Sequence, residues 1–178
     1  MSYQVHSRTG QILQVMKIVA LLAFIGFSIQ AGAIIISYIV SCVNPEAAKN
    51  LYKGLNMYQL SQYNFSYYTL QVSFTVLVLM LKSYVCYYLV KTLSGLTLST
   101  PFTIEVAQTL EKISYLLLAA SIVGLMGNIY AAWLLKKTGE QFGGGITEEF
   151  LFMAGLVFVI AQIFKRGVEI QTENDLTV

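Results

Sequence analysis

Few side chains in this sequence could carry acid–base or metal chemistry. Its 178 residues contain one histidine, His6, and two cysteines. A histidine-based triad or metal site needs more material than this. Two carboxylates, Glu173 and Asp175, flank Asn174 in the last residues, and paired carboxylates can exchange protons or bind a hard cation. No glycine-framed calcium loop surrounds them, so packing or partner docking is favoured over metal binding. The sequence predicts no enzyme, no metal site and no cofactor.

A second group of polar side chains lies within apolar stretches. A proton relay or a path for a charged substrate usually shows intramembrane Asp, Glu, His or Arg, whereas this group contains four amides and one lysine. We expect the amides to form hydrogen bonds between helices. The lysine is expected to extend its stem towards the lipid headgroups, with a buried functional role as the alternative. The group consists of Gln30, Gln71, Lys82, Asn128 and Gln162.

The elements that must position these side chains are apolar helices. The composition is 56% hydrophobic and 11% charged, against about 25% charged residues in soluble domains. Uncharged runs cover 18–45, 54–81, 113–135 and 150–164, and a helix needs roughly 20 apolar residues to cross a bilayer. We predict an all-α, integral membrane four-helix bundle in one domain, 1–178, with spans at about 18–43, 67–90, 113–135 and 146–166. A cleaved signal peptide is disfavoured for the first run because its apolar residues continue to Val40.

The distribution of Lys and Arg predicts the topology. Under the positive-inside rule, four spans with both chain ends in the cytoplasm leave four basic residues outside and seven inside or at the inner edge. The seven are Arg8, Lys17, Lys82, Lys91, Lys112, Lys165 and Arg166. This topology separates Cys42 from Cys86, so no disulfide is expected. The net charge of +2 is too close to balance for direct nucleic-acid binding through a broad basic face.

The segments between the spans differ in what they predict. The outer segment, from 44 to about 66, leads into an aromatic cluster, which is typical of an interfacial belt, with a ligand-stacking site as the rival. The cluster consists of Tyr58, Tyr63, Phe65, Tyr67 and Tyr68. The outer glycines at 139–145 predict a flexible turn. On the inner side, Thr103 suits a helix N-cap, and Glu105 lies in the first turn. The third helix is therefore expected to begin about two turns before the membrane, and the fourth to continue beyond it.

Two stretches of the sequence together resemble a known family. The elements are Pro-Phe-Thr-x-Glu before the third span and a run from Ala161 that ends Glu-Asn-Asp-Leu-Thr-Val. They are similar to the bacterial membrane proteins of domain of unknown function 2975. That resemblance implies a bacterial inner-membrane protein with four helices and no established activity, often encoded beside a small helix-turn-helix regulator. It implies a cytoplasmic docking motif at Pro101, Phe102, Thr103, Glu105, Arg166, Gly167, Glu169, Glu173, Asn174, Asp175 and Leu176.

Two functions remain in competition at this point. The first is a non-enzymatic regulatory or interaction component in the membrane, which docks a cytoplasmic partner through its inner loop and C-terminal tail. The second is a subunit of a small transporter or channel, with the amides and Lys82 along a path. A cavity that reaches Gln30, Asn128 or Lys82 would favour transport, and a dry bundle with ordered inner helix extensions would favour docking. Membrane lipid is an expected partner, and oligomerisation stays open.

Overall fold

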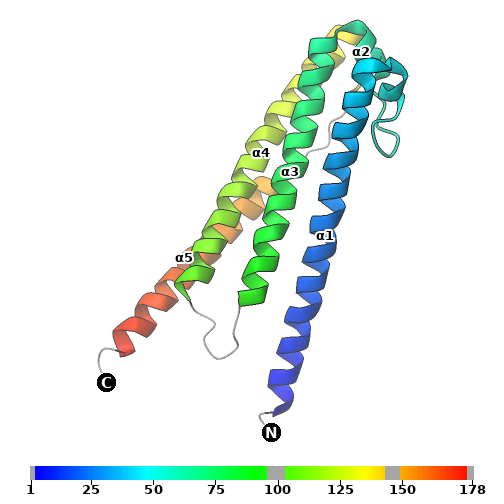
Figure 1. The fold of residues 1–178 in the computed structure, drawn as a ribbon. Coiled ribbons are helices and arrows are strands. Elements are labelled where there is room, and N and C mark those ends of the chain that lie inside the picture. Colours follow the sequence, from blue (N-terminus) through cyan, green and yellow to red (C-terminus); the bar gives the residue numbers. More distant parts are fainter. Residues whose placement is uncertain (1–2, 96–102, 143–148, 176–178) are drawn as a thin grey trace. The chain divides into compact units, whose positions relative to one another are not determined.

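The chain is helical throughout the part that the structure describes. The computed structural model describes residues 3–95, 103–142 and 149–175, with the side chains of 3–7, 9, 149, 174 and 175 excepted. Their elements are α1 (Tyr3–Val43), the 3₁₀-helix η1 (Pro45–Lys49), α2 (Tyr58–Tyr63), α3 (Phe65–Gly95), α4 (Ile104–Thr138) and α5 (Glu149–Asp175) (Figure 1). The all-α class is confirmed, and no strand occurs within these ranges.

Four of the helices are long and apolar enough to cross a membrane. The segments are Gly10–Val43, Phe65–Gly95, Ile104–Thr138 and Phe150–Glu173. Large apolar side chains stand on their outer surfaces, such as Leu22 on α1 at 63% exposed and Phe152 on α5 at 73%. A water-soluble protein rarely exposes so much contiguous apolar surface, whereas lipid accommodates it and the helices satisfy their own backbone hydrogen bonds. The chain is a multi-pass membrane protein.

The chain divides into two compact units. Unit 1 comprises Met1–Phe24, Tyr84–Leu118 and Glu149–Val178, and unit 2 comprises Ile25–Ser83 and Ala119–Glu148. The helices α1, α3 and α4 each contribute one segment to both units. The α1–α3 connection belongs to unit 2.

Within unit 2, the segment between α1 and α3 folds into a cap. Pro45 starts η1, and the Asn44 side chain accepts a hydrogen bond from the backbone N–H of Glu46. Its buried residues are Ala48, Leu51, Met57 and Leu60, each at most 1% exposed. The Met57 N–H donates to the Ala48 carbonyl at 2.8 Å, which joins η1 to the residue before α2. The polar segment expected as a connection is therefore a packed element.

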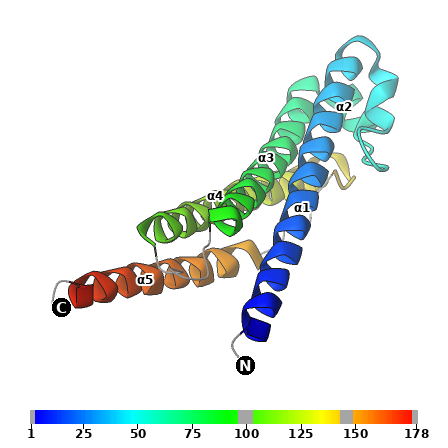
Figure 2. The same cartoon turned by 60° about the horizontal axis from the view of Figure 1, so that its bottom comes forward.

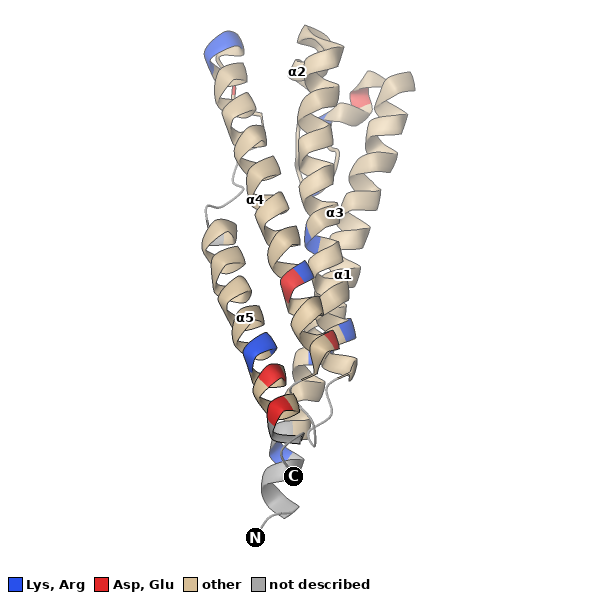
Figure 3. Ribbon diagram, turned by 90° about the vertical axis from the view of Figure 1, so that its left-hand side faces the viewer, with Lys and Arg blue, Asp and Glu red and all other residues tan. Residues whose placement is uncertain are grey.

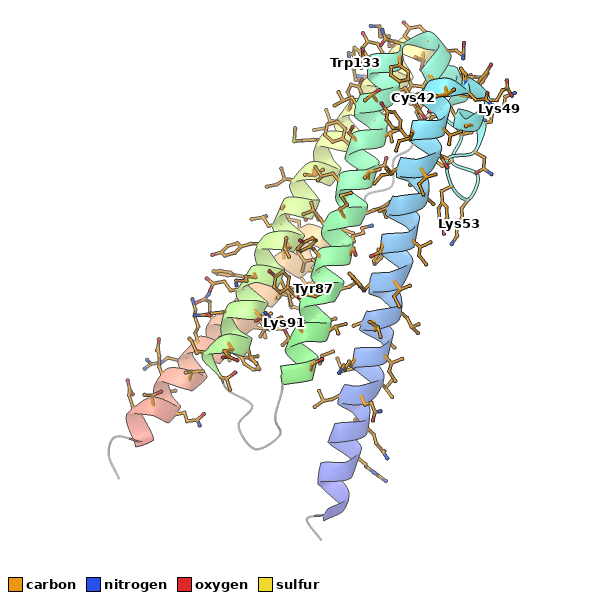
Figure 4. The ribbon with its side chains drawn as sticks, in the orientation of Figure 1. Cys42, Lys49, Lys53, Tyr87, Lys91 and Trp133 are labelled. Atoms are coloured by element: carbon orange, nitrogen blue, oxygen red, sulfur yellow. The ribbon has the colours of Figure 1, made fainter. Side chains whose placement is uncertain are left out.

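Lys53 and Gly54 form a turn inside the cap. Lys53 and Gly54 both have positive φ, 47° and 82°, and the Asn50 side chain accepts a hydrogen bond from the Gly54 N–H at 3.0 Å. Glycine tolerates this backbone conformation, whereas residues with a side chain rarely adopt it. Figure 4 shows Lys53 on the loop that follows η1 and Lys49 at η1 itself.

The antiparallel seam of α1 and α3 in unit 2 is held by hydroxyl groups. The hydroxyls of Ser28 and Ser83 lie 2.8 Å apart, and those of Ser41 and Tyr68 lie 2.7 Å apart. Tyr68 is fully buried, so the prediction of an interfacial belt is wrong for this tyrosine. The bond to Ser41 explains the difference, because a buried phenol needs a partner. Tyr63 and Phe65 remain exposed.

Unit 1 has a smaller apolar core, made by α3, α4 and α5. Its buried members are Ile113, Leu117 and Ala154. Phe24 of α1 packs against Tyr87 of α3, with ring centroids 6.2 Å apart. Segments of all four long helices are therefore present in this unit, as a four-helix bundle requires. Both cysteines are free, Cys42 in unit 2 and Cys86 in unit 1, as expected.

Candidate functional site

A cavity in unit 2 brings together most of the polar side chains from the apolar stretches. Its volume is about 320 Å³, within the range of small-molecule sites. Segments of α1, α3 and α4 form its walls, together with the turn of the cap. Its lining residues are Gln30, Ile34, Tyr52, Lys53, Leu55, Gln71, Phe74, Thr75, Val78, Leu79, Lys82, Gly127 and Asn128.

The register of the helices follows from side-chain contacts between them. On α1, Gln30 follows two residues after Ser28, which meets Ser83, so Gln30 lies near the level of Lys82. On α4, Tyr130 packs against Phe74 with ring centroids 6.0 Å apart, which places Asn128 near the middle of the cavity. Gln71 lies at the other end, eleven residues before Lys82.

Gln71 has the clearest unmet hydrogen-bonding requirement in this cavity. Its side chain is 3% exposed, and its Nε2 donates to the Phe142 carbonyl oxygen at 3.1 Å. Its Oε1 is buried and accepts no hydrogen bond within the described ranges. A buried acceptor left without a donor costs about 1–3 kcal/mol of stability. A ligand that supplied this donor would recover part of that free energy.

The charge in the cavity is positive. Lys82 and Lys53 both line it, and no carboxylate stands among its lining residues. Lys82 is half-buried, and its Nζ lies 5.8 Å from the centroid of the Phe27 ring. Its place in this lining agrees with the alternative of a buried lysine, whose functional role stays a prediction. The cavity is therefore suited to an anionic group, with amide side chains able to donate hydrogen bonds.

The candidate residues from the sequence divide between the two units. Gln30, Lys82 and Asn128 meet at the cavity, and Gln71 joins them. Gln162 does not, because it lies exposed on α5 in unit 1. Sequence reasoning missed Lys53. Gly54 favours a turn beside Lys53, but the position of Lys53 at the cavity depends on the folding of the cap.

The predicted docking motif lies on α4 and α5 in unit 1. Thr103 caps α4 as predicted, since its Oγ1 accepts from the Val106 N–H at 3.3 Å, and Glu105 lies in the first turn. The helix α5 continues to Asp175, beyond the predicted end of the fourth span at residue 166. Pro101, Phe102 and Leu176 lie outside the described residues. Asn174 and Asp175 belong to the α5 backbone, and their side chains lie outside the description as well.

One ion pair joins the two helices that carry this motif. Lys165 Nζ on α5 lies 2.8 Å from Glu111 Oε2 on α4, with both side chains partly buried. Tyr115 lies one turn after Glu111 on α4, and Phe158 lies two turns before Lys165 on α5. Their rings pack together with centroids 6.4 Å apart. Figure 2 shows the N-terminal part of α4 and α5 running alongside one another. Neither Glu111 nor Lys165 belongs to the family motif, so the sequence did not single out the residues that make this contact.

Apart from Glu149 at its first position, the charged residues of α5 lie in its C-terminal part (Figure 3). Arg166 Nη1 donates to Glu169 Oε2 at 2.7 Å, and both side chains are exposed. Gly167 is half-buried between them, and Glu173 is exposed one turn later. This end of α5 is thus a polar helical surface that continues beyond an apolar span.

These features define an all-α, multi-pass membrane protein with a polar cavity between its helices. Residues 44–178 match the sequence model of the DUF2975 family, described as a protein of unknown function. The chain belongs to this family, which confirms the resemblance seen in its motifs. The match begins directly after α1 and covers all the helices that follow. Comparison with curated proteins and with solved structures finds no match.

Proposed function

We propose that this chain is a non-enzymatic membrane component that docks a cytoplasmic partner on the paired segments of α4 and α5. The expected setting is a bacterial inner membrane, with both chain ends in the cytoplasm and lipid around the spans. The partner implied by the family resemblance is a small helix-turn-helix regulator. Direct contact with nucleic acid is not part of this proposal, because the net charge of +2 offers no broad basic face.

The observation that carries the proposal is the Glu111–Lys165 pair. It holds α5 against α4 at 2.8 Å, just before the exposed charged turns of α5 begin. A helix that projects alone from a membrane has few contacts to order it, because short isolated helices are marginal in water. Pairing with α4 supports a fixed surface, which a docking partner can recognise without ordering the helix at the time of binding.

The exposed charges on that surface favour a complementary partner. Arg166, Glu169 and Glu173 are exposed on successive turns of α5. Such charges contribute more to partner choice and association rate than to raw affinity. A regulator with a basic groove opposite Glu169 and Glu173 would suit this pattern.

The proposal is tested by charge exchange across the helix pair. The full chain in native-membrane nanodiscs is used to capture the purified regulator encoded beside it. Glu111→Lys alone and Lys165→Glu alone should each lower capture, because each leaves two like charges in contact. The double exchange should restore it. Removal of residues 173–178 should abolish capture while membrane insertion is unchanged.

A matched control uses the ion pair of the cap. Glu46 and Lys49 also form an ion pair, but they lie only three residues apart in the sequence and belong to unit 2. The exchange Glu46→Lys with Lys49→Glu should leave capture unchanged in both single variants and in the double variant. Capture that survives both the truncation and the single charge reversals on α4 and α5 would contradict the docking proposal.

The cavity in unit 2 favours a second candidate, a subunit of a small transporter or channel. It reaches Gln30, Lys82 and Asn128, which is the arrangement expected of a path. Its α3 lining, from Gln71 to Lys82, covers about 16 Å of helix rise, whereas the hydrocarbon core is about 30 Å thick. The cavity lining alone is therefore too short for a complete path, and docking remains the first proposal.

Flux measurements separate the two candidates. The chain is reconstituted in liposomes, and uptake of labelled anions is followed with and without Lys82→Met. Transport predicts uptake that the substitution reduces. Docking without transport predicts no uptake above that of protein-free liposomes.

A further inference from the structure

The cavity of unit 2 has chemistry that neither docking nor the family match explains. Its two ends differ. One end holds Lys82 with Gln30 near the same level, and the other holds the buried Gln71. We propose that this cavity binds a medium-length amphipathic acid that carries a hydrogen-bond donor at the end opposite its acid group.

The acid group is assigned to the Lys82 end. The cavity is lined by lysines and amides and by no carboxylate, so an anion gains attraction there without like-charge repulsion. The Cα–Cβ bonds of a helix tilt towards its N-terminus, so the Lys82 side chain leans along α3 into the cavity. The Gln30 amide can donate a second hydrogen bond to the same anion.

The donor group is assigned to the Gln71 end. Gln71 is 3% exposed and its Oε1 accepts no hydrogen bond within the described part of the chain. Its Nε2 is already committed to the Phe142 carbonyl, which fixes the orientation of the amide. A ligand hydroxyl or N–H that displaces the atoms now covering this oxygen would satisfy the remaining acceptor. A carboxylate oxygen would not, since it has no hydrogen to donate.

The wall between these two ends is mainly apolar. Gln71, Phe74, Val78 and Lys82 recur at helical spacing, which aligns them on one face of α3. Ile34 of α1 lines the same cavity. An alkyl chain buried against these side chains gains hydrophobic stabilisation. The helix rise of about 16 Å between Gln71 and Lys82 sets the length of the ligand.

Three probes of equal chain length test each end separately. They are 12-hydroxydodecanoate, dodecanoate without the hydroxyl, and 1,12-dodecanediol without the acid. Binding is measured by titration calorimetry on the full chain in phosphatidylcholine nanodiscs. The hydroxy acid should bind most tightly, about fivefold better than dodecanoate and at least about tenfold better than the diol. These ratios follow from one neutral hydrogen bond and one charged contact.

Variants then assign each preference to its residue. Gln71→Leu should remove the advantage of the hydroxy acid over dodecanoate and leave its advantage over the diol. Lys82→Met should do the reverse. The matched controls are Gln162→Leu on α5 and Lys91→Met on α3, neither of which lines the cavity. Both should preserve all three affinities.

Gln71→Leu also removes the bond to Phe142, so its folding is checked by its melting transition. If that variant does not fold, Gln30→Leu tests the acid end instead and should lower the affinities of the two acids without changing that of the diol. Equal affinity for all three probes, or preferences unchanged in Lys82→Met and Gln30→Leu, would overturn the proposal. Absence of binding by the hydroxy acid would overturn it as well.

Discussion

The two units differ in the polar contacts that characterise them. Unit 2 buries several polar side chains, although its Glu46–Lys49 pair is exposed. Ser41 and Tyr68 bond to each other in its core, and Gln71 is buried beside a cavity. Unit 1 keeps its charges at the surface, as the Arg166–Glu169 pair shows. Buried polar groups must be satisfied or they destabilise the fold, whereas exposed ion pairs contribute little to stability. Unit 2 is therefore suited to hold a ligand, and unit 1 to present a surface.

Truncation of the buried tyrosine is the strongest test of this contrast. Tyr68→Ala should lower the free energy of unfolding by roughly 3–5 kcal/mol, because it removes a fully buried ring and leaves a cavity. The measurement is reversible unfolding of the chain in mixed micelles. Tyr63→Ala, at an exposed position on α2, is the control and should stay within about 0.5 kcal/mol of the parent. Similar losses in both variants would contradict the assignment of Tyr68 to the core.

Removal of the phenol alone measures the polar contribution within that core. Tyr68→Phe keeps the ring and deletes the hydroxyl that lies 2.7 Å from Ser41 Oγ. The expected loss is about 1 kcal/mol. Ser41 also donates to the Tyr38 carbonyl at 2.6 Å, so its hydroxyl retains a partner. The companion variant Ser41→Ala should make the subsequent Tyr68→Phe change nearly neutral in a double-mutant cycle.

Loss of the ion pair in unit 1 should have a smaller effect. Glu111→Gln removes the charged contact with Lys165, and partly exposed pairs contribute about 0.2–1 kcal/mol. The free energy of unfolding in mixed micelles should therefore fall by less in Glu111→Gln than in Tyr68→Ala. Added salt should narrow the difference between Glu111→Gln and the parent, because salt screens exposed charges. If Glu111→Gln lowered the free energy of unfolding by more than Tyr68→Phe does, the Glu111–Lys165 pair would be behaving as a buried ion pair.

The smallest effect is expected from the pH dependence of the cap. The hydrogen bond from Lys49 lowers the pKa of the Glu46 carboxyl below its ordinary value, and the same bond raises the pKa of Lys49. The Glu46 contribution is thus present above its unfolded pKa and lost as the pH falls through its folded pKa. The Lys49 contribution is lost as the pH rises through its own folded pKa.

Carboxyl chemical shifts in a pH titration measure this shift directly. In Lys49→Gln the pKa of Glu46 should return towards its ordinary value. An unchanged titration of Glu46 in that variant would show that the pair is absent in solution.

Much of the fold could be predicted from local sequence. Uncharged runs marked the four spans, and three of these runs are longer than the roughly 20 residues of a bilayer crossing. Each of the first three predicted ranges lies within a long helix. The fourth begins at 146, in residues that the structure does not describe, and continues within α5. Thr103 was identified as the cap of α4 because N-capping depends on a residue type and its immediate neighbours. Such features need no knowledge of distant contacts.

The candidate sites were harder to predict because they depend on pairing. Gln30, Lys82 and Asn128 were recognised as unusual inside apolar runs, but Gln162 has the same character and lies elsewhere. The difference is which face of which helix meets a neighbour. The same limit applies to Tyr68, which was assigned to a membrane interface because it lies in a cluster of aromatic residues. It applies also to the Glu111–Lys165 contact, which joins residues 54 positions apart.

The sequence by itself determined that this chain is a helical membrane protein of the DUF2975 family, since hydrophobic length and motif spacing are properties of the chain alone. Only the tertiary structure decided that its polar residues form a cavity. The cap folds over apolar residues that are separated in sequence, and the antiparallel seam of α1 and α3 sets the level at which Gln30 faces Lys82. Those outcomes depend on packing between distant segments, which no local pattern specifies.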